Sequence, residues 1–237
     1  MFRRNDSICA SPAEAPIQIG GRAVAEAVGT ALLLVVIVGS GIMAQGLFPE
    51  SMGLALLATG GGLVALLLTF AAISGAHFNP VVTLVDAASG ERPWSDVAPY
   101  IAAQVVGSVV GVLVTHVMFE HQIFELSAKV RSGLPLMLSE VVATFGLVAV
   151  IRGVGRSRSD AVPYAVAGYI SAAYWFTPST SFANPAVTIA RAMTDSFSGI
   201  RPNDVPGFVA AQLLGGAAAA LLLRWFASKA RLHQGDQ

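Results

Sequence analysis

Two Asn-Pro pairs, Asn79-Pro80 and Asn184-Pro185, are the residues of this sequence whose types and order could do chemistry. Pro at the first position of a helix loses no hydrogen bond, and an Asn directly before it caps the free amides of the first turn. Each pair therefore predicts the start of a helix, where the macrodipole places about half a positive elementary charge. Two such ends brought together would give amide donors and a positive field, which favour a neutral hydrogen-bonding molecule and repel a cation.

The composition indicates where these helix starts lie. Of the 237 residues, 54% are apolar and 12% are charged, whereas a soluble domain carries about 25% charged residues. The 14 basic and 14 acidic residues balance, and no basic run is long enough to neutralise phosphates, which argues against a nucleic-acid partner. The lone Cys9 excludes a disulfide framework and a Cys-based metal site. The chain is therefore predicted to be a polytopic protein of the lipid bilayer.

Apolar runs of about 20 residues, the length needed to cross a bilayer, predict six transmembrane helices. Two further apolar segments, His77–Ala87 and Asn184–Thr194, are too short to span, and such pieces survive in lipid only when protein surrounds them. The predicted fold is thus all-helical, with six transmembrane helices plus two re-entrant half-helices. The six runs are Ala23–Leu47, Met52–Ile73, Val97–Phe119, Leu134–Ile151, Ala161–Phe176 and Val205–Leu223.

The second half of the chain repeats the first. Each half carries Glu-x-x-x-Thr, beginning at Glu26 or Glu140, then the Asn-Pro pair, then Ala-Ala-Gln followed within three residues by Gly. Each repeat, about 22–130 and 131–227, holds three predicted spans, an odd number, so the two halves must insert with opposite orientations. Such an inverted repeat places the functional site near the midplane, between the halves. The two Asn-Pro helix starts are expected to meet there.

Two carboxylates lie inside predicted spans, a position that suggests function by default. In one interpretation Glu26 and Glu140 relay protons, and the protein is a proton-coupled secondary carrier. In the other, which their symmetric placement favours, each accepts hydrogen bonds and braces the irregular backbone before a half-helix. His77, two residues before Asn79, is expected to line the approach to the helix ends or to pack. No nucleophile–base pair or metal-ligand cluster accompanies these residues, so no enzyme activity, metal or cofactor is expected.

The motifs Ser74-Gly-Ala-His-Phe-Asn-Pro80 and Ser181-Phe-Ala-Asn-Pro-Ala186, on six spans, resemble the aquaporin and aquaglyceroporin channels of the major intrinsic protein family. The resemblance covers about Arg22 to Ala227. It implies that residues 22–227 form one channel domain, between cytosolic tails at 1–21 and 228–237, and that the channel conducts water or small uncharged solutes passively. It also implies a homotetramer with a pore in each subunit. The distribution of Lys and Arg places both termini in the cytoplasm, which implies the inner (plasma) membrane.

The chain departs from the family pattern at the pore. Its first box, Asn79-Pro80-Val81, has Val where the family usually has Ala, whereas the second, Asn184-Pro185-Ala186, keeps Ala. Water-selective relatives place an Arg directly after the second box, and here that residue is Val187. Counting from the boxes as the family pattern does, the selectivity filter consists of Thr59, Ala172, Ser181 and Val187.

This filter is expected to be wide and uncharged. It resembles the filters of bacterial channels associated with arsenic resistance, which implies passage of glycerol-like polyols and of arsenous acid or methylated arsenicals. Arg191 lies one helical turn beyond Val187. Two interpretations stay open for Arg191: it hangs over the outer mouth and partly replaces the missing charge, or it makes a structural contact to the outer loop.

Overall fold

The computed structural model describes residues 17–47 and 53–235, with only the backbone described for 53–56 and 229–235. The predicted N-terminal tail therefore lies, up to residue 16, outside the described residues. The described residues form eight α-helices, with three short 3-10 turns, Trp94–Asp96, Ser159–Ala161 and Pro202–Asp204, directly before α4, α6 and α8. The helices are α1 (Ile19–Leu47), α2 (Gly53–Ser74), α3 (Pro80–Ala88), α4 (Val97–Met118), α5 (Leu134–Gly155), α6 (Val162–Phe176), α7 (Pro185–Arg191) and α8 (Val205–Gly235).

The all-helical membrane fold with two half-helices is confirmed. Among the described residues, five helices, α1, α2, α4, α5 and α8, are long and apolar enough to cross a membrane. The sixth predicted span, α6, has 15 residues and continues directly from the 3-10 turn Ser159–Ala161. The half-helices α3 and α7 begin at the two prolines, as the Asn-Pro pairs predict.

Two helices extend beyond their predicted limits. α1 begins at Ile19 rather than Ala23, and its first turns are held to the body by Arg22, whose guanidinium contacts Asp96 at 2.8 Å. α8 continues past Leu223 to Gly235, because the residues that follow are mostly good helix formers and a helix need not end where its apolar run ends. The C-terminal segment expected as a tail from residue 228 is therefore helical as far as Gly235.

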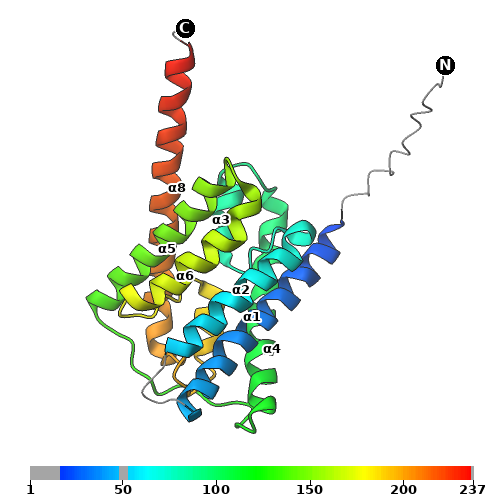
Figure 1. Cartoon of the computed structure of the whole chain (residues 1–237), viewed down its shortest axis with the longest axis vertical. Helices are drawn as coiled ribbons and strands as arrows, with labels where there is room; N and C mark the ends of the chain where they lie inside the picture. The colour runs from blue at the N-terminus through cyan, green and yellow to red at the C-terminus, as the bar shows by residue number, and fades with distance from the viewer. Residues whose placement is uncertain (1–16, 48–52, 236–237) are drawn as a thin grey trace, which may run out of the picture.

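The helices pack as two equivalent sets. In the first half α1 packs against α4 and α2, and in the second half α5 packs against α8 and α6. The half-helices lie inside this arrangement, where α3 contacts α4 and α8, and α7 contacts the same two helices. α1 begins at the upper right of the helical body and α8 ends above it (Figure 1), so both lie toward the same end of the molecule, as an even number of crossings requires.

Glycines allow the paired helices of each half to touch backbone to backbone. A Cβ built on Gly107 of α4 would overlap the carbonyl oxygen of Ala27 in α1, and one built on the equivalent Gly215 of α8 would overlap that of Val141 in α5. Small residues at such crossings let helices approach closely, which is a main source of packing energy within a bilayer. The two glycines thus fix the same crossing in both halves.

Replacing Gly107 with Ala is expected to lower the free energy of unfolding by about 1–3 kcal/mol, the range for overpacking a close contact. The methyl group meets backbone, so α1 and α4 must separate to admit it. The control is Gly153→Ala, on an exposed part of α5 where a Cβ meets no atom within 4 Å. Melting of the purified protein in detergent measures both, and equal melting temperatures for the two variants would contradict the expectation.

Candidate pore site

Each Asn of the two boxes caps the half-helix that follows it. The Oδ1 of Asn79 accepts a hydrogen bond from the amide of Val81 at 3.0 Å. The Oδ1 of Asn184 accepts hydrogen bonds from the amides of Ala186 at 3.0 Å and Val187 at 3.3 Å. Because these oxygens face the first turns, the Nδ2 groups of the two side chains point away from their own helices.

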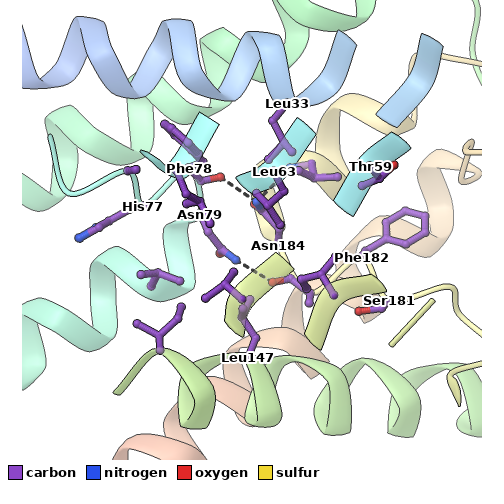
Figure 2. A pocket seen from close by; sticks show the side chains of 18 of the residues that line it. Leu33, Thr59, Leu63, His77, Phe78, Asn79, Leu147, Ser181, Phe182 and Asn184 are labelled. Atoms are coloured by element: carbon purple, nitrogen blue, oxygen red, sulfur yellow. Dashed lines mark hydrogen bonds between the residues drawn. The ribbon is translucent and has the colours of Figure 1, made fainter. Parts of the chain in front are cut away.

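Those amide groups join the two halves of the chain. The Nδ2 of Asn79 donates to the carbonyl oxygen of Ala183 at 2.8 Å, and the Nδ2 of Asn184 donates to that of Phe78 at 2.7 Å. Figure 2 shows both hydrogen bonds as dashed lines. The N-terminal ends of α3 and α7 therefore meet inside the bundle, and their positive macrodipole ends point to one place.

Glu26 holds the backbone that leads into α3. Its carboxylate, fully buried, accepts hydrogen bonds from the amides of His77 at 3.0 Å and Phe78 at 2.7 Å. It also accepts from the hydroxyl of Ser74 at 2.6 Å and from the Nε2 of Gln104 at 2.8 Å. Four donors thus surround this carboxylate, which is the arrangement that the bracing interpretation requires.

Glu140 does the same before α7. Its fully buried carboxylate accepts hydrogen bonds from the amides of Phe182 and Ala183, both at 2.9 Å, and from the Nε2 of Gln212 at 2.7 Å. Buried polar groups need hydrogen-bond partners, and these donors supply them. Both carboxylates are therefore engaged in holding backbone, and neither lies on the wall of the cavity described below.

The braced segments are strained at equivalent positions. Ala76 and Phe78 before α3 have φ of 49° and 50°, and Ser181 and Ala183 before α7 have φ of 48° and 47°. This left-handed region is unfavourable for residues with a Cβ, at about 1–3 kcal/mol each, so the surrounding structure must enforce it. This left-handed backbone conformation turns the carbonyl oxygens of Phe78 and Ala183 toward the asparagines.

A cavity of about 160 Å³ runs past the two asparagines. In Figure 2, His77 lies on one side of them, and Thr59, Ser181 and Phe182 lie on the other. The rest of the wall is largely apolar, so a solute inside meets few fixed charges. Its apolar side chains from the long helices are Leu33, Ile37, Leu63, Leu67, Leu147, Ile151, Val162, Val166 and Ile170.

At the end near Ser181, Arg191 forms part of the cavity wall and is 1% exposed. Its guanidinium carbon lies 3.4 Å from the ring centroid of Phe182, and its Nε donates to the carbonyl oxygen of Ser198 in the outer loop. Among the described residues, no carboxylate lies within ion-pair distance of it. Arg191 therefore contacts the loop that contains Ser198 and also lines the cavity.

At the opposite end, His77 and Asp86 form the polar part of the wall. The Nε2 of His77 lies 3.0 Å from the Oδ2 of Asp86, and its Nδ1 lies 3.0 Å from the Oγ1 of Thr83. Arg152 of α5 also contacts Asp86, at 3.4 Å. His77 was predicted to line the approach to the helix ends or to pack, whereas Asp86 was not predicted, although an acidic residue in an otherwise apolar half-helix was a usable signal.

The comparisons with known proteins agree with this geometry. The model of the family "Major intrinsic protein" matches residues 16–171 and 157–237 of the chain. This chain belongs to the major intrinsic protein family.

Named relatives of this major intrinsic protein include two bacterial proteins. It is 52% identical over 214 residues to aquaglyceroporin AqpS of Rhizobium meliloti (strain 1021), over 89% of this chain and 91% of that protein. It is 30% identical over 151 residues to the glycerol uptake facilitator protein of Bacillus subtilis (strain 168), over 56% of this chain and 54% of that protein. The solved aquaglyceroporin from Plasmodium falciparum shares the fold, with a TM-score of 0.64 at 19% identity, over 86% of this chain and 95% of the solved one.

Three of the four positions counted from the family pattern line the cavity of this major intrinsic protein, namely Thr59, Ser181 and Val187. The hydroxyl of Ser181 is buried and has no hydrogen-bond partner among the described residues. It is therefore available to a solute at that end of the cavity.

The fourth position, Ala172, does not lie on the cavity wall. Ala172 is exposed on α6, and the same helix instead contributes Ile170 and Tyr174 to the wall. Residues two apart lie on nearly opposite faces of a helix, so Ala172 cannot share the wall with these two. The count backward from Asn184 assumes a fixed loop length after the helix, and here α6 ends at Phe176 with its own register. Four-residue spacing along the helix was the better signal, since every fourth residue from Val162 to Tyr174 lines the cavity.

The third residue of the first box packs away from the cavity. Val81 is 2% exposed, lies in a cluster with Val85 and Val148, and is not part of the cavity wall. A Cβ built on Gly216 of α8 would overlap a methyl group of Val81. Because Gly216 has no side chain, it leaves room for the valine at position 81, and the start of α3 is not displaced.

Proposed function

We propose that this major intrinsic protein is a passive transmembrane channel for small uncharged solutes, including water and glycerol-like polyols. The observation that carries the proposal is the meeting of two half-helix starts, joined through Asn79 and Asn184, beside a cavity with mostly apolar walls. A cation there would lose hydration water and meet two positive helix ends, whereas a neutral solute can exchange hydrogen bonds along the path. The names of the two bacterial relatives support the same solute class.

We propose further that the outer filter passes compact polyhydroxy solutes, among them arsenous acid and methylated arsenicals. Thr59, Ser181 and Val187 bring two hydroxyls and no charge to the wall. Undissociated arsenous acid presents three hydroxyls on a compact body, much as glycerol does, and can bond to the unpartnered Ser181 hydroxyl in the same way.

Purified protein reconstituted in liposomes tests both proposals. Parallel shrinkage assays with water, glycerol, urea and arsenite are expected to show faster movement of water, glycerol and arsenite than in protein-free liposomes. Absence of glycerol and water flux above background would overturn the channel, and absence of arsenite flux alone would overturn only the arsenical assignment.

The same liposomes address the alternative of a proton-coupled carrier. Because Glu26 and Glu140 are occupied by backbone and side-chain donors, dissipating the proton gradient with an ionophore is expected to leave glycerol flux unchanged. Loss of net uptake under that treatment would instead support a carrier.

We propose that Arg191 supplies the fixed positive charge of the outer filter. This guanidinium lies on the cavity wall, and no carboxylate of the described residues is within ion-pair distance of it, so it repels an entering cation strongly because the apolar surroundings screen it poorly. Arg191→Gln is therefore expected to raise the potassium leak of liposomes roughly tenfold or more while glycerol flux changes less than about twofold.

Two controls accompany that substitution. Arg191→Lys keeps the charge and should stay close to wild type in potassium leak. Arg201→Gln removes an arginine of the outer loop that pairs with Asp204 and is not part of the cavity wall. An unchanged leak in Arg191→Gln, with glycerol flux intact, would contradict the role proposed for Arg191.

We propose that the protein assembles as a homotetramer in the inner (plasma) membrane with both termini in the cytoplasm. The common position of the α1 start and the α8 end (Figure 1) supports termini on one side, and the basic residues of that side support the cytoplasm. Native mass spectrometry measures the assembly, and reporter fusions at each terminus measure the orientation.

A further inference from the structure

A second cavity lies away from the pore, at the end of the molecule where α8 emerges. It has a volume of about 370 Å³ and lies between the ends of α3 and α5 and the middle of α8. We call it the arginine cleft, after the three arginines among its lining residues. Its charged and polar lining residues are Ser89, Glu91, Arg152, Arg156 and Arg224.

The arginines of the cleft are unevenly paired. Arg152 contacts both Asp86 and Glu91, so its charge is largely compensated. Arg156 and Arg224 are exposed, and among the described residues neither has a carboxylate within ion-pair distance. Within the part of the chain that the structure describes, the Arg156 side chain makes a long hydrogen bond to the carbonyl oxygen of Leu223, at 3.4 Å. Two uncompensated guanidinium groups, one directly after the end of α5 and one in α8, therefore face one cleft.

The cleft lies at the depth of lipid head groups. The predicted apolar run of α8 ends at Leu223, and Arg224 follows it directly. Trp225 and Phe226 come next and are 54% and 49% exposed, as is usual for aromatic residues at a membrane–water interface. Arg224 is therefore placed where the hydrocarbon gives way to phosphate groups.

The apolar lining of the cleft argues for a lipid rather than a free anion. Val85, Ala220, Leu223 and Ala227 line it beside the arginines. On α8, Leu221 follows the lining residue Ala220 in the sequence and is 67% exposed, which offers apolar surface to an acyl chain. A lipid presents phosphate and hydrocarbon together, whereas inorganic phosphate would leave the apolar lining unused.

We propose that the arginine cleft binds the phosphate head group of an anionic glycerophospholipid from the leaflet at the α8 end. Basic pockets between transmembrane helices on the cytoplasmic side are a recognised way to hold such head groups. Glu91 and the C-terminal end of α3 oppose the anion, and the two unpaired arginines outweigh them. The site is separate from the pore, so it does not depend on the proposed transport function.

Trp225 allows a direct test on the full chain. With Trp94 and Trp175 replaced by Phe, Trp225 is the remaining tryptophan, and lipids with brominated acyl chains quench it when they bind beside it. Brominated phosphatidylglycerol is expected to compete for this position about tenfold better than brominated phosphatidylcholine. The double substitution Arg156→Gln and Arg224→Gln should reduce that preference to about onefold.

Arg158→Gln is the matched control, since Arg158 is exposed on the same side, two residues from Arg156, and does not line the cleft. It should keep the full preference. Equal quenching by the two lipids in the unsubstituted chain, or an equal loss in Arg158→Gln, would overturn the proposal. A third result would also overturn the proposal: millimolar inorganic phosphate displaces phosphatidylglycerol, whereas chloride at equal ionic strength does not. The ligand would then be a free anion.

Discussion

Replacing Val187 with Arg is expected to reduce glycerol flux roughly tenfold or more and water flux by only about twofold. Val187 is 2% exposed and lies on the cavity wall, and its amide is capped by Asn184. An arginine there would add a long side chain to a cavity of only about 160 Å³ and would bring a second guanidinium near Arg191. Because the diameter of the pore restricts a polyol before it restricts water, glycerol flux should fall more than water flux. Liposome shrinkage with each solute measures the two fluxes.

A second variant separates size from charge in that experiment. Val187→Met lengthens the side chain, although less than arginine does, and adds no charge, so it should reduce glycerol flux by less than Val187→Arg does. Retained water flux in the arginine variant would show that the protein is folded and inserted. An equal fall of water and glycerol flux, or no fall in either, would contradict a filter at Val187.

The second large effect is expected at Glu140. Glu140→Ala removes the acceptor of two backbone amides and of Gln212, all in the buried interior. Each buried donor left without a partner costs about 1–3 kcal/mol, so the sum is comparable with the whole stability of many proteins. We expect little folded protein from this variant. Glu140→Gln keeps one acceptor oxygen but turns a side-chain amide NH2, itself a donor, toward another donor, and should melt at an intermediate temperature.

Membrane yield and melting in detergent measure the Glu140 series, with Glu125→Ala as the control. Glu125 is a partly exposed carboxylate whose contact with His121 is long, at 3.9 Å, and its loss should have little effect. A Glu140→Ala protein that melts like wild type but no longer transports would contradict the bracing role. It would instead return the proton-relay interpretation to consideration.

The sequence predicted the half-helices well because their signals are local. An Asn followed by Pro caps its own helix wherever the chain goes, and α3 and α7 begin at Pro80 and Pro185. The long helices follow from apolar length alone, so their existence was predictable, although the ends of α1 and α8 were not. Those ends depend on an ion pair of Arg22 and on helix-forming residues beyond the apolar run.

The features of the site that the sequence did not predict depend on loop length and on contacts between distant segments. Ala172 was misplaced because the register of α6 is set by where that helix ends, which motif counting does not see. The position of Arg191 on the same helix face as Val187 was predictable from helical spacing. Its contact with Ser198 was not, because it depends on the fold of the loop that contains Ser198. In the same way, Arg156 and Arg224 lie far apart in the sequence, and only the packing of α5 against α8 brings them to one cleft.

The crosswise asparagine bonds impose an order on biosynthesis. When the first repeat has left the ribosome, neither the Ala183 carbonyl nor the Asn184 amide group exists yet, so Asn79 and Phe78 lack the partners they have in the finished protein. The half-helix α3 can reach its final position only after translation has passed residue 184. Nascent chains truncated before that point contain every span of the first repeat but lack α7, the second of the two helix starts that meet in the pore.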